Sequence, residues 1–218
     1  KQLGVTVVVE NKAGGSGTIG GKAVQTAPAD GHTLLFSAAT QVLAKQVLSA
    51  PPYDPQTDFA PVARTGTAPL LLVVAPAKAQ ARLSDVLGAV KQQPDKWTAA
   101  LMDVAGGHTD LMLDSMISLM QMAKSGKVKP IAITSAKRSS LMPDVPTFKE
   151  SGLPTFAYES WYGVWAPRDT PADRIAALNA AINTATAELA KAGALTALGI
   201  EPVTESAAQF RAFIANDV

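Results

Sequence analysis

A glycine-rich turn at residues 14–21 holds the residue types in this chain that are best suited to binding an anion. It lies between an apolar, β-branched run at residues 5–11 and a second apolar run at residues 30–37, so the pattern predicts strand, loop, helix and strand. The first turn of a helix has backbone N–H groups without partners, and glycines allow a ligand to approach these groups closely. The turn is therefore a candidate anion site.

Two other interpretations of this turn stay open on the residues alone. Gly15, Gly17 and Gly20 fit the G-x-G-x-x-G spacing of a dinucleotide site, so an α/β enzyme that binds a phosphorylated ligand at residues 15–20 is an alternative. That fingerprint also requires an acidic residue at the end of the next strand, and residues 36–40 contain none. The glycines could also serve only to shape a sharp loop.

Other groups of residues lack the spacing of a catalytic or metal site. His32 and His108 lie in separate turns far apart in the sequence, and the chain has no cysteine, so we expect no metal site. Neither Ser16 nor Ser37 belongs to a G-x-S-x-G motif, which argues against a serine hydrolase. The turn at residues 14–21 is the strongest chemical signal in the sequence.

The composition is that of a globular protein with a substantial core. The chain has 218 residues, of which 47% are hydrophobic and 17% charged, enough for one large domain or two small ones. No apolar stretch approaches the roughly 20 residues of a membrane helix. The net charge of +1, without a cluster of basic and aromatic residues, argues against nucleic-acid binding.

Strand-like and helix-like segments alternate along the chain, which predicts an α/β fold with a largely parallel sheet. Residues 70–75 and 130–135 have the apolar runs of buried strands, and residues 83–91 have the period of an amphipathic helix. Residues 170–173 and 206–209 have the residue pattern of helix starts. A series at near-helical spacing favours core packing over a methionine-lined groove: Met112, Met116 and Met120.

A series of sequence blocks carries a family resemblance. It begins with VVVENKAGGSGTIG at residues 7–20 and ends with SWYGVWAP at residues 160–167, and the blocks between them are residues 27–35, 52–62, 134–139 and 141–147. In this order, the blocks resemble the substrate-binding receptors of tripartite tricarboxylate transporters, also called the Bug or TctC-like family. The similarity extends from residue 5 to residue 213.

The resemblance implies a two-lobed, periplasmic-binding-protein-like α/β fold with crossover hinge strands. Lobe one would contain residues 1–66 and 162–218, and lobe two residues 67–161, with the ligand in the cleft between the lobes. Family members have a strand and a loop ahead of the segment matched by residues 1–4. They also have a further loop, helix and strand near residues 98–101, so we expect a segment omitted there and a break in the coordinates.

The resemblance also implies which residues contact the ligand. They lie in the glycine turn, after the next strand and in lobe two: Gly15, Ser16, Gly17, Thr18, Ser37, Ala38, Thr40 and Asp114. The carboxyl ends of strands are where open α/β sheets bind ligands, so we expect residues 37–40 to lie beside residues 15–18. Neither segment contains Arg or Lys, so we expect neutral donors to hold a carboxylate.

Asp114 has two compatible interpretations. It lies between a strand-like run at 110–113 and a helix-like run at 115–120, which is the position of a helix N-cap. The family places an acid facing the cleft at this position. An ionised carboxylate there would repel a carboxylate ligand unless it accepts a hydrogen bond from a ligand ammonium or hydroxyl, or orients an amide or a water molecule that contacts the ligand.

Together, the residues and the resemblance predict a periplasmic receptor for an organic carboxylate, with no catalysis and no cofactor. The expected partners are a small organic carboxylate and the membrane permease subunits of the transporter, with no nucleic acid, and we expect a monomer. A periplasmic carboxylate-sensing module is an alternative that the sequence does not separate from a transport receptor. The identity of the carboxylate also lies beyond the sequence, because backbone amides recognise only its anionic group.

Overall fold

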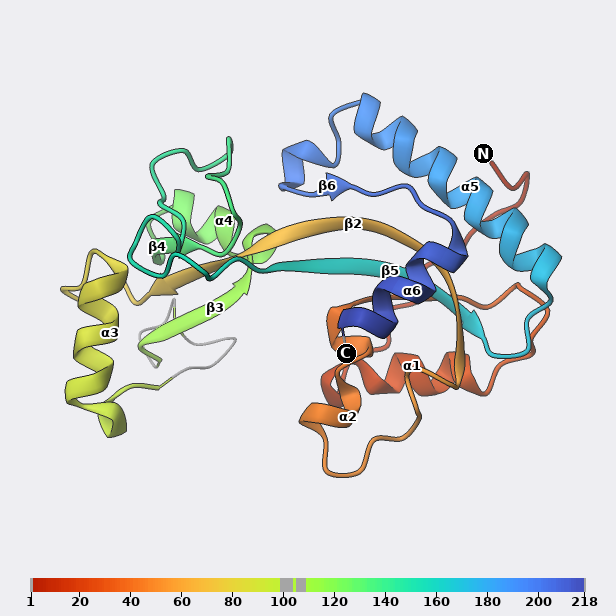
Figure 1. The fold of residues 1–218 in the computed structure, drawn as a ribbon, viewed down its shortest axis with the longest axis horizontal. Coiled ribbons are helices and arrows are strands. Elements are labelled where there is room, and N and C mark those ends of the chain that lie inside the picture. Colours follow the sequence, from red (N-terminus) through yellow and green to blue (C-terminus); the bar gives the residue numbers. More distant parts are fainter. Residues whose placement is uncertain (1, 99–103, 105–108, 218) are drawn as a thin grey trace. The chain divides into compact units, whose positions relative to one another are not determined.

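The computed structural model describes residues 2–98, 104 and 109–217 (Figure 1). The chain divides into two compact units. Unit 1 contains Lys1–Thr67, Trp161–Leu195 and Glu201–Val218, and unit 2 contains Ala68–Ser160 and Thr196–Ile200. The expected break near residues 98–101 falls largely outside the described residues. Within the described residues, no helix has the length and apolar character needed to cross a membrane.

The sheet of unit 1 has strand β5 (Glu159–Pro167) between β1 (Leu35–Ala38) and β2 (Phe59–Val74). A short strand, β6 (Glu201–Pro202), also pairs with β2. Strand β1 pairs with β5 in antiparallel register, with Ser37 opposite Gly163, and β6 is antiparallel to β2. The predicted parallel sheet is therefore wrong for these strands. Continuous apolar runs reflect burial on both faces, which strands of either direction can have.

Helices cover both faces of this sheet. On one face, the core includes Val24 of α1 (Thr18–Gln25) and Phe210 of α6 (Ala207–Asp217), which pack with Trp161 and Trp165 of β5. On the other face, α5 (Ala172–Lys191) packs against Val164 and its neighbours. Figure 1 shows α5 on the opposite side of β2 and β5 from α1. The remaining elements of unit 1 are α2 (Ala44–Val47) and the 3-10 turns η1 (Gly15–Gly17) and η2 (Ala39–Gln41).

The predicted strand at residues 5–11 is wrong. The segment has no regular secondary structure, and the side chains of Val7, Val8 and Val9 are 70%, 83% and 81% exposed. A strand needs a neighbour for its N–H and C=O groups, and none of the strand pairings in the described part of the chain includes this run. High β-propensity alone did not create a strand here.

The sheet of unit 2 is built around the carboxyl-terminal half of β2. Strands β3 (Leu111–Ser115) and β4 (Lys129–Ile133) both pair with it in antiparallel register. Alternating residues of β2 contribute to two cores, one shared with α4 (Met116–Lys124) and one with α3 (Leu83–Gln92). The expected core packing of the methionines is confirmed: Met112, Met116 and Met120. Unit 2 also contains η3 (Pro94–Lys96) and η4 (Thr196–Leu198).

Helix starts are partly as predicted. At the start of α6, Ser206 Oγ accepts a bond from the Gln209 N–H (3.2 Å), and Gln209 Oε1 accepts from the Ser206 N–H (2.9 Å), which is a capping box. At the start of α5, the Thr170 hydroxyl instead donates to the Pro167 carbonyl (2.8 Å), and Pro171 is the N-cap residue. Residue type therefore identified both helix starts but misassigned the cap of α5.

Candidate functional site

The glycine turn leads through η1 directly into α1. Gly14, Gly15 and Gly17 have φ angles of 113°, 55° and 89°, in the region that favours glycine. A Cβ at Gly15 would lie 2.6 Å from Thr18 Oγ1, whereas a Cβ at Gly17 would meet no atom within 4 Å. Backbone conformation and close packing therefore both favour glycine in this turn, with conformation alone the reason at Gly17.

The polar groups of the turn are partly used within it. The Gly17 N–H donates to the Gly14 carbonyl (3.0 Å), and both the N–H and the hydroxyl of Thr18 donate to the Gly15 carbonyl, the hydroxyl at 2.6 Å. Thr18 is buried, and the hydrogen bond from its hydroxyl to the Gly15 carbonyl stabilises the turn. The N-cap residue, Gly17, has no side chain with which to cap α1, and the first amide of the helix, that of Thr18, is satisfied by the Gly15 carbonyl instead.

The second predicted segment lies beside the turn. Element η2 follows β1 immediately and contacts η1, so the predicted proximity of residues 37–40 to residues 15–18 is confirmed. Ser37 is half-buried and lies on the same face of β1 as Leu35, which packs in the core shared with α1. Thr40 is exposed. Unit 1 thus brings together seven of the eight predicted residues.

The two segments contain no charged side chain, and the nearest cations in the sequence have other partners. Lys12 pairs with Glu10 at 2.6 Å, and Lys22 donates to Gln25 Oε1 at 2.6 Å. A carboxylate at the start of α1 would therefore meet backbone amides and small side chains first. Among the described residues, no group of three or more His, Cys, Asp or Glu side chains is arranged to hold a metal ion.

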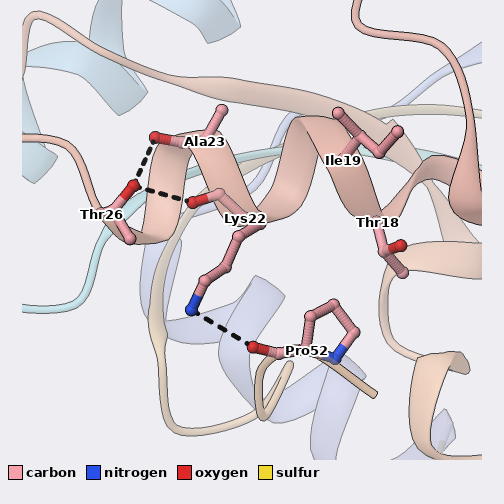
Figure 2. A pocket seen from close by; sticks show the side chains of 6 residues that line it. All are labelled: Thr18, Ile19, Lys22, Ala23, Thr26 and Pro52. Carbon is pink, nitrogen blue, oxygen red and sulfur yellow. Dashed lines mark hydrogen bonds between the residues drawn. The ribbon is translucent and has the colours of Figure 1, made fainter. Parts of the chain in front are cut away.

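A groove of about 330 Å³ runs along the outer side of α1. Figure 2 shows its lining residues, which follow the helix from its first residue to its C-cap and include one proline from a nearby loop: Thr18, Ile19, Lys22, Ala23, Thr26 and Pro52. Thr18 is the predicted site residue in this set. The sequence analysis missed the groove, because Lys22 and Ala23 belong to no motif.

Asp114 lies in unit 2, at the end of β3. Its Oδ1 accepts a hydrogen bond from the Ser115 N–H at 2.7 Å. The N-cap of α4 is Ser115, whose hydroxyl oxygen accepts from the Ile117 N–H at 3.2 Å. The N-cap interpretation of Asp114 is therefore displaced by one residue, and its predicted ligand contact stays a prediction.

Sequence comparison identifies the family. The family described as "Tripartite tricarboxylate transporter family receptor" matches residues 1–100 and 97–218. The chain belongs to this family. The two matched ranges meet at residues 97–100, where the sequence analysis expects an omitted segment, and that expectation stays a prediction.

Curated relatives and solved structures agree with this assignment. Protein BugT of Bordetella pertussis is 33% identical over 99% of this chain and 77% of its own length. A UPF0065 protein from the tcbD-tcbE intergenic region of Pseudomonas sp. strain P51 is 33% identical over 92% of this chain and 70% of its own length. The structure of the periplasmic binding protein BugD has a TM-score of 0.90 with 29% identity, covering 100% of this chain and 85% of that protein.

The predicted two-lobed, periplasmic-binding-protein-like α/β class is confirmed by these structures. Because the family and its solved members are solute-binding proteins, the chain is a binding protein and not an enzyme. A further solved relative is MatC from Rhodopseudomonas palustris with bound malate, at a TM-score of 0.90 and 28% identity, covering 99% of this chain and 86% of that protein. Another R. palustris protein, solved with adipate, matches with a TM-score of 0.90 at 25% identity, over 96% of this chain and 82% of that protein.

Proposed function

We propose that this protein is a periplasmic receptor that captures an organic carboxylate and delivers it to a tripartite tricarboxylate-type membrane transporter. The observation that carries the proposal is the match, at a TM-score of 0.90, to two proteins whose structures were solved with malate and with adipate. Both of these ligands are small dicarboxylates. Family membership supports the membrane permease subunits as partners.

The carboxylate is held by neutral donors where η1 meets α1 and where β1 meets η2. The N–H groups of Gly17 and Thr18 already donate within the turn, so the proposed donors are the amides that follow Thr18 in the first turn of α1. The helix dipole favours a negative charge there by about 0.3–1 kcal/mol. Ser37, Ala38 and Thr40 border this position in unit 1, while Thr18 holds the turn through the Gly15 carbonyl. Asp114 supplies an acceptor for a ligand hydroxyl or ammonium group.

The two compact units are the proposed lobes of the receptor. Strand β2 passes from unit 1 to unit 2 after Thr67, and β5 returns after Ser160. The chain enters unit 2 once more at Thr196–Ile200, a segment that the sequence analysis assigned to lobe one. Hinge motion in such connections lets a ligand favour a closed state by binding it more tightly than the open state. The carboxylate would drive closure in this way.

A panel of carboxylates tests the proposal by thermal stabilisation. Aliphatic, hydroxylated, amino and aromatic carboxylates, with malate and adipate included, are each added to the purified protein. A true ligand at 100 times its Kd should stabilise the protein by roughly 2.7 kcal/mol, whereas the matching amides and alcohols should have no effect. Stabilisation by none of the carboxylates would contradict the proposal.

A further inference from the structure

The Tyr53 side chain contacts Gln41, which directly follows the segment at residues 37–40, and Gly21, which lies three residues after the segment at residues 15–18. We propose that Tyr53 is a positioning residue that fixes one segment against the other. Tyr53 belongs to the proline-rich turn at residues 51–58, outside both segments. The inference rests on the proposed function, because it makes the affinity for a carboxylate depend on Tyr53. Its structural part, the link between α1 and η2, can be tested without a ligand.

The first contact is a buried hydrogen bond to η2. The Tyr53 hydroxyl donates to Gln41 Oε1 at 2.6 Å, and the two residues are only 5% and 3% exposed. Gln41 is the last residue of η2 and follows Thr40 directly. Burial raises the pKa of the Tyr53 phenol above its ordinary value, so the hydroxyl stays protonated and keeps donating at neutral pH.

The second contact is with α1. The hydroxyl end of the Tyr53 ring lies against Gly21, where a Cβ would come within 2.5 Å of Tyr53 Cε1 and 2.6 Å of its hydroxyl oxygen. Only glycine at position 21 lets the ring approach the helix this closely. The hydroxyl end of Tyr53 therefore contacts α1 at Gly21 and also donates the hydrogen bond to Gln41 in η2.

The Tyr53 ring also packs against an aromatic neighbour. Phe59 packs edge-to-face on Tyr53, with ring centroids 5.1 Å apart and an interplanar angle of 84°. The turn is also tied to α1 independently, because Gln25 Nε2 donates to Asp58 Oδ2 at 2.6 Å. Removal of the Tyr53 hydroxyl should therefore leave the ring and its loop in place.

Gln41 depends on this hydroxyl. Its Nε2 is buried and has no hydrogen-bond partner within the described part of the chain, so the bond from Tyr53 is what orients the amide. Without it, both polar atoms of a buried side chain lack partners, which favours a shift of Gln41 towards water. Such a shift would move η2 and Thr40 relative to the first turn of α1.

Tyr53→Phe removes the hydroxyl and keeps the ring. We expect the affinity for malate, adipate or the best carboxylate of the panel to fall by about tenfold, the change that corresponds to one net hydrogen bond. Amide hydrogen exchange in the free protein should rise at residues 16–21 and 39–41 and stay unchanged in α5. A merely structural role would raise exchange throughout unit 1 and leave the affinity of the folded protein unaltered.

Two neighbouring glycines provide a matched pair that does not depend on the hydroxyl. Gly21→Ala places a Cβ against the Tyr53 ring, whereas a Cβ at Gly20 would have only ordinary contacts, the closest 3.7 Å from the Lys12 carbonyl oxygen. Gly21→Ala should raise hydrogen exchange in η2 and weaken carboxylate binding, and Gly20→Ala should leave exchange in η2 unchanged. Adding Tyr53→Leu to Gly21→Ala removes the clash and should reverse the added effect of the alanine.

Unchanged exchange in η2 for both Tyr53→Phe and Gly21→Ala would overturn the proposal. Altered exchange with unchanged affinity would also overturn it, because the positioning would then have no role in binding. If the wild-type protein binds none of the carboxylates, the proposed function fails and the role of Tyr53 in affinity fails with it. The exchange data would then still decide whether Tyr53 links α1 to η2.

Discussion

Single residues decide the geometry of the candidate site. The glycine spacing predicts a tight turn at a helix start, and the left-handed φ angles of Gly15 and Gly17 bear out that reading. The contact between Tyr53 and Gln41 could not be predicted, because 12 residues separate the partners and neither belongs to a motif. A backbone conformation that only glycine adopts easily can be predicted from residue type, whereas a hydrogen bond between residues distant in the sequence cannot.

Gly17→Val tests the turn at the residue scale. A β-branched residue at a φ of 89° costs roughly 1–3 kcal/mol of strain, and relaxation of this strain would move the first amides of α1. We expect carboxylate binding to be lost in calorimetry, with the fold retained in circular dichroism. Gly126→Val is the matched control, since Gly126 in unit 2 also has a positive φ (72°) and open space around its Cα. Normal binding by Gly17→Val would contradict the assignment of the turn.

Asp110 makes the free energy of unfolding depend on pH in the acidic range. Its pKa is lowered mainly by the ion pair with Lys78 and then by hydrogen bonds from Thr98, whose N–H lies 2.8 Å from Oδ2. Because the pKa is lower in the folded state, the stabilisation is complete above the unfolded value of about 4 and is lost as the pH falls through the folded value. Asp110→Asn should therefore reduce stability at pH 7 and flatten its decline below about pH 4 in denaturant titrations. An unchanged acid slope would refute this role.

At the scale of elements, contacts between neighbouring elements explain which sequence-based predictions were confirmed and which were wrong. The position of residues 37–40 was predictable because the end of a strand and the start of the adjacent helix meet at one edge of a sheet. The prediction of a strand at residues 5–11 was wrong because this run has no strand partner among the described residues. The prediction of parallel strands was wrong because an apolar run does not specify the direction of its neighbour. Pairing depends on distant residues that a local pattern does not contain.

The start of α6 depends on a largely buried ion pair. Arg64 of β2 contacts both carboxylate oxygens of Glu205 at 3.0 Å, and its guanidinium lies 3.7 Å from the centroid of the Phe213 ring. The two charged side chains are only 16% and 12% exposed. Arg64→Met should leave Glu205 unpaired and lower the free energy of unfolding by about 3 kcal/mol in urea titrations.

The ion pair of Arg82 with Asp85 serves as a control for this prediction, because the Arg82 side chain is 78% exposed. Arg82→Met should change stability by less than about 1 kcal/mol, as exposed pairs usually do. Equal effects of the two substitutions would show that the Arg64 pair contributes no more than a surface contact.

For the whole molecule, sequence blocks carried more information than local periodicity. The family and its fold follow from blocks spread over the chain, and the malate- and adipate-bound relatives support a carboxylate as the ligand class. The groove along α1 and the exposed run at residues 5–11 follow from neither, because both depend on which surfaces remain uncovered after folding.

Binding by a neutral site predicts a weak dependence on salt. The two candidate segments contain no cation, and hydrogen bonds from neutral amides depend less on ionic strength than contacts with exposed charged side chains. Calorimetry of the best carboxylate at low and moderate ionic strength should therefore show only a small change in Kd. A loss of affinity of about a hundredfold or more would indicate a site dominated by charged side chains.

A crystal structure of the protein with its most stabilising carboxylate tests the central claim most directly. The account predicts that one carboxylate group lies within hydrogen-bond distance of backbone N–H groups at the start of α1, beside Ser37 and Thr40, without an arginine or lysine contact. A carboxylate bound away from the glycine turn, or held there by an arginine or lysine side chain, would contradict it.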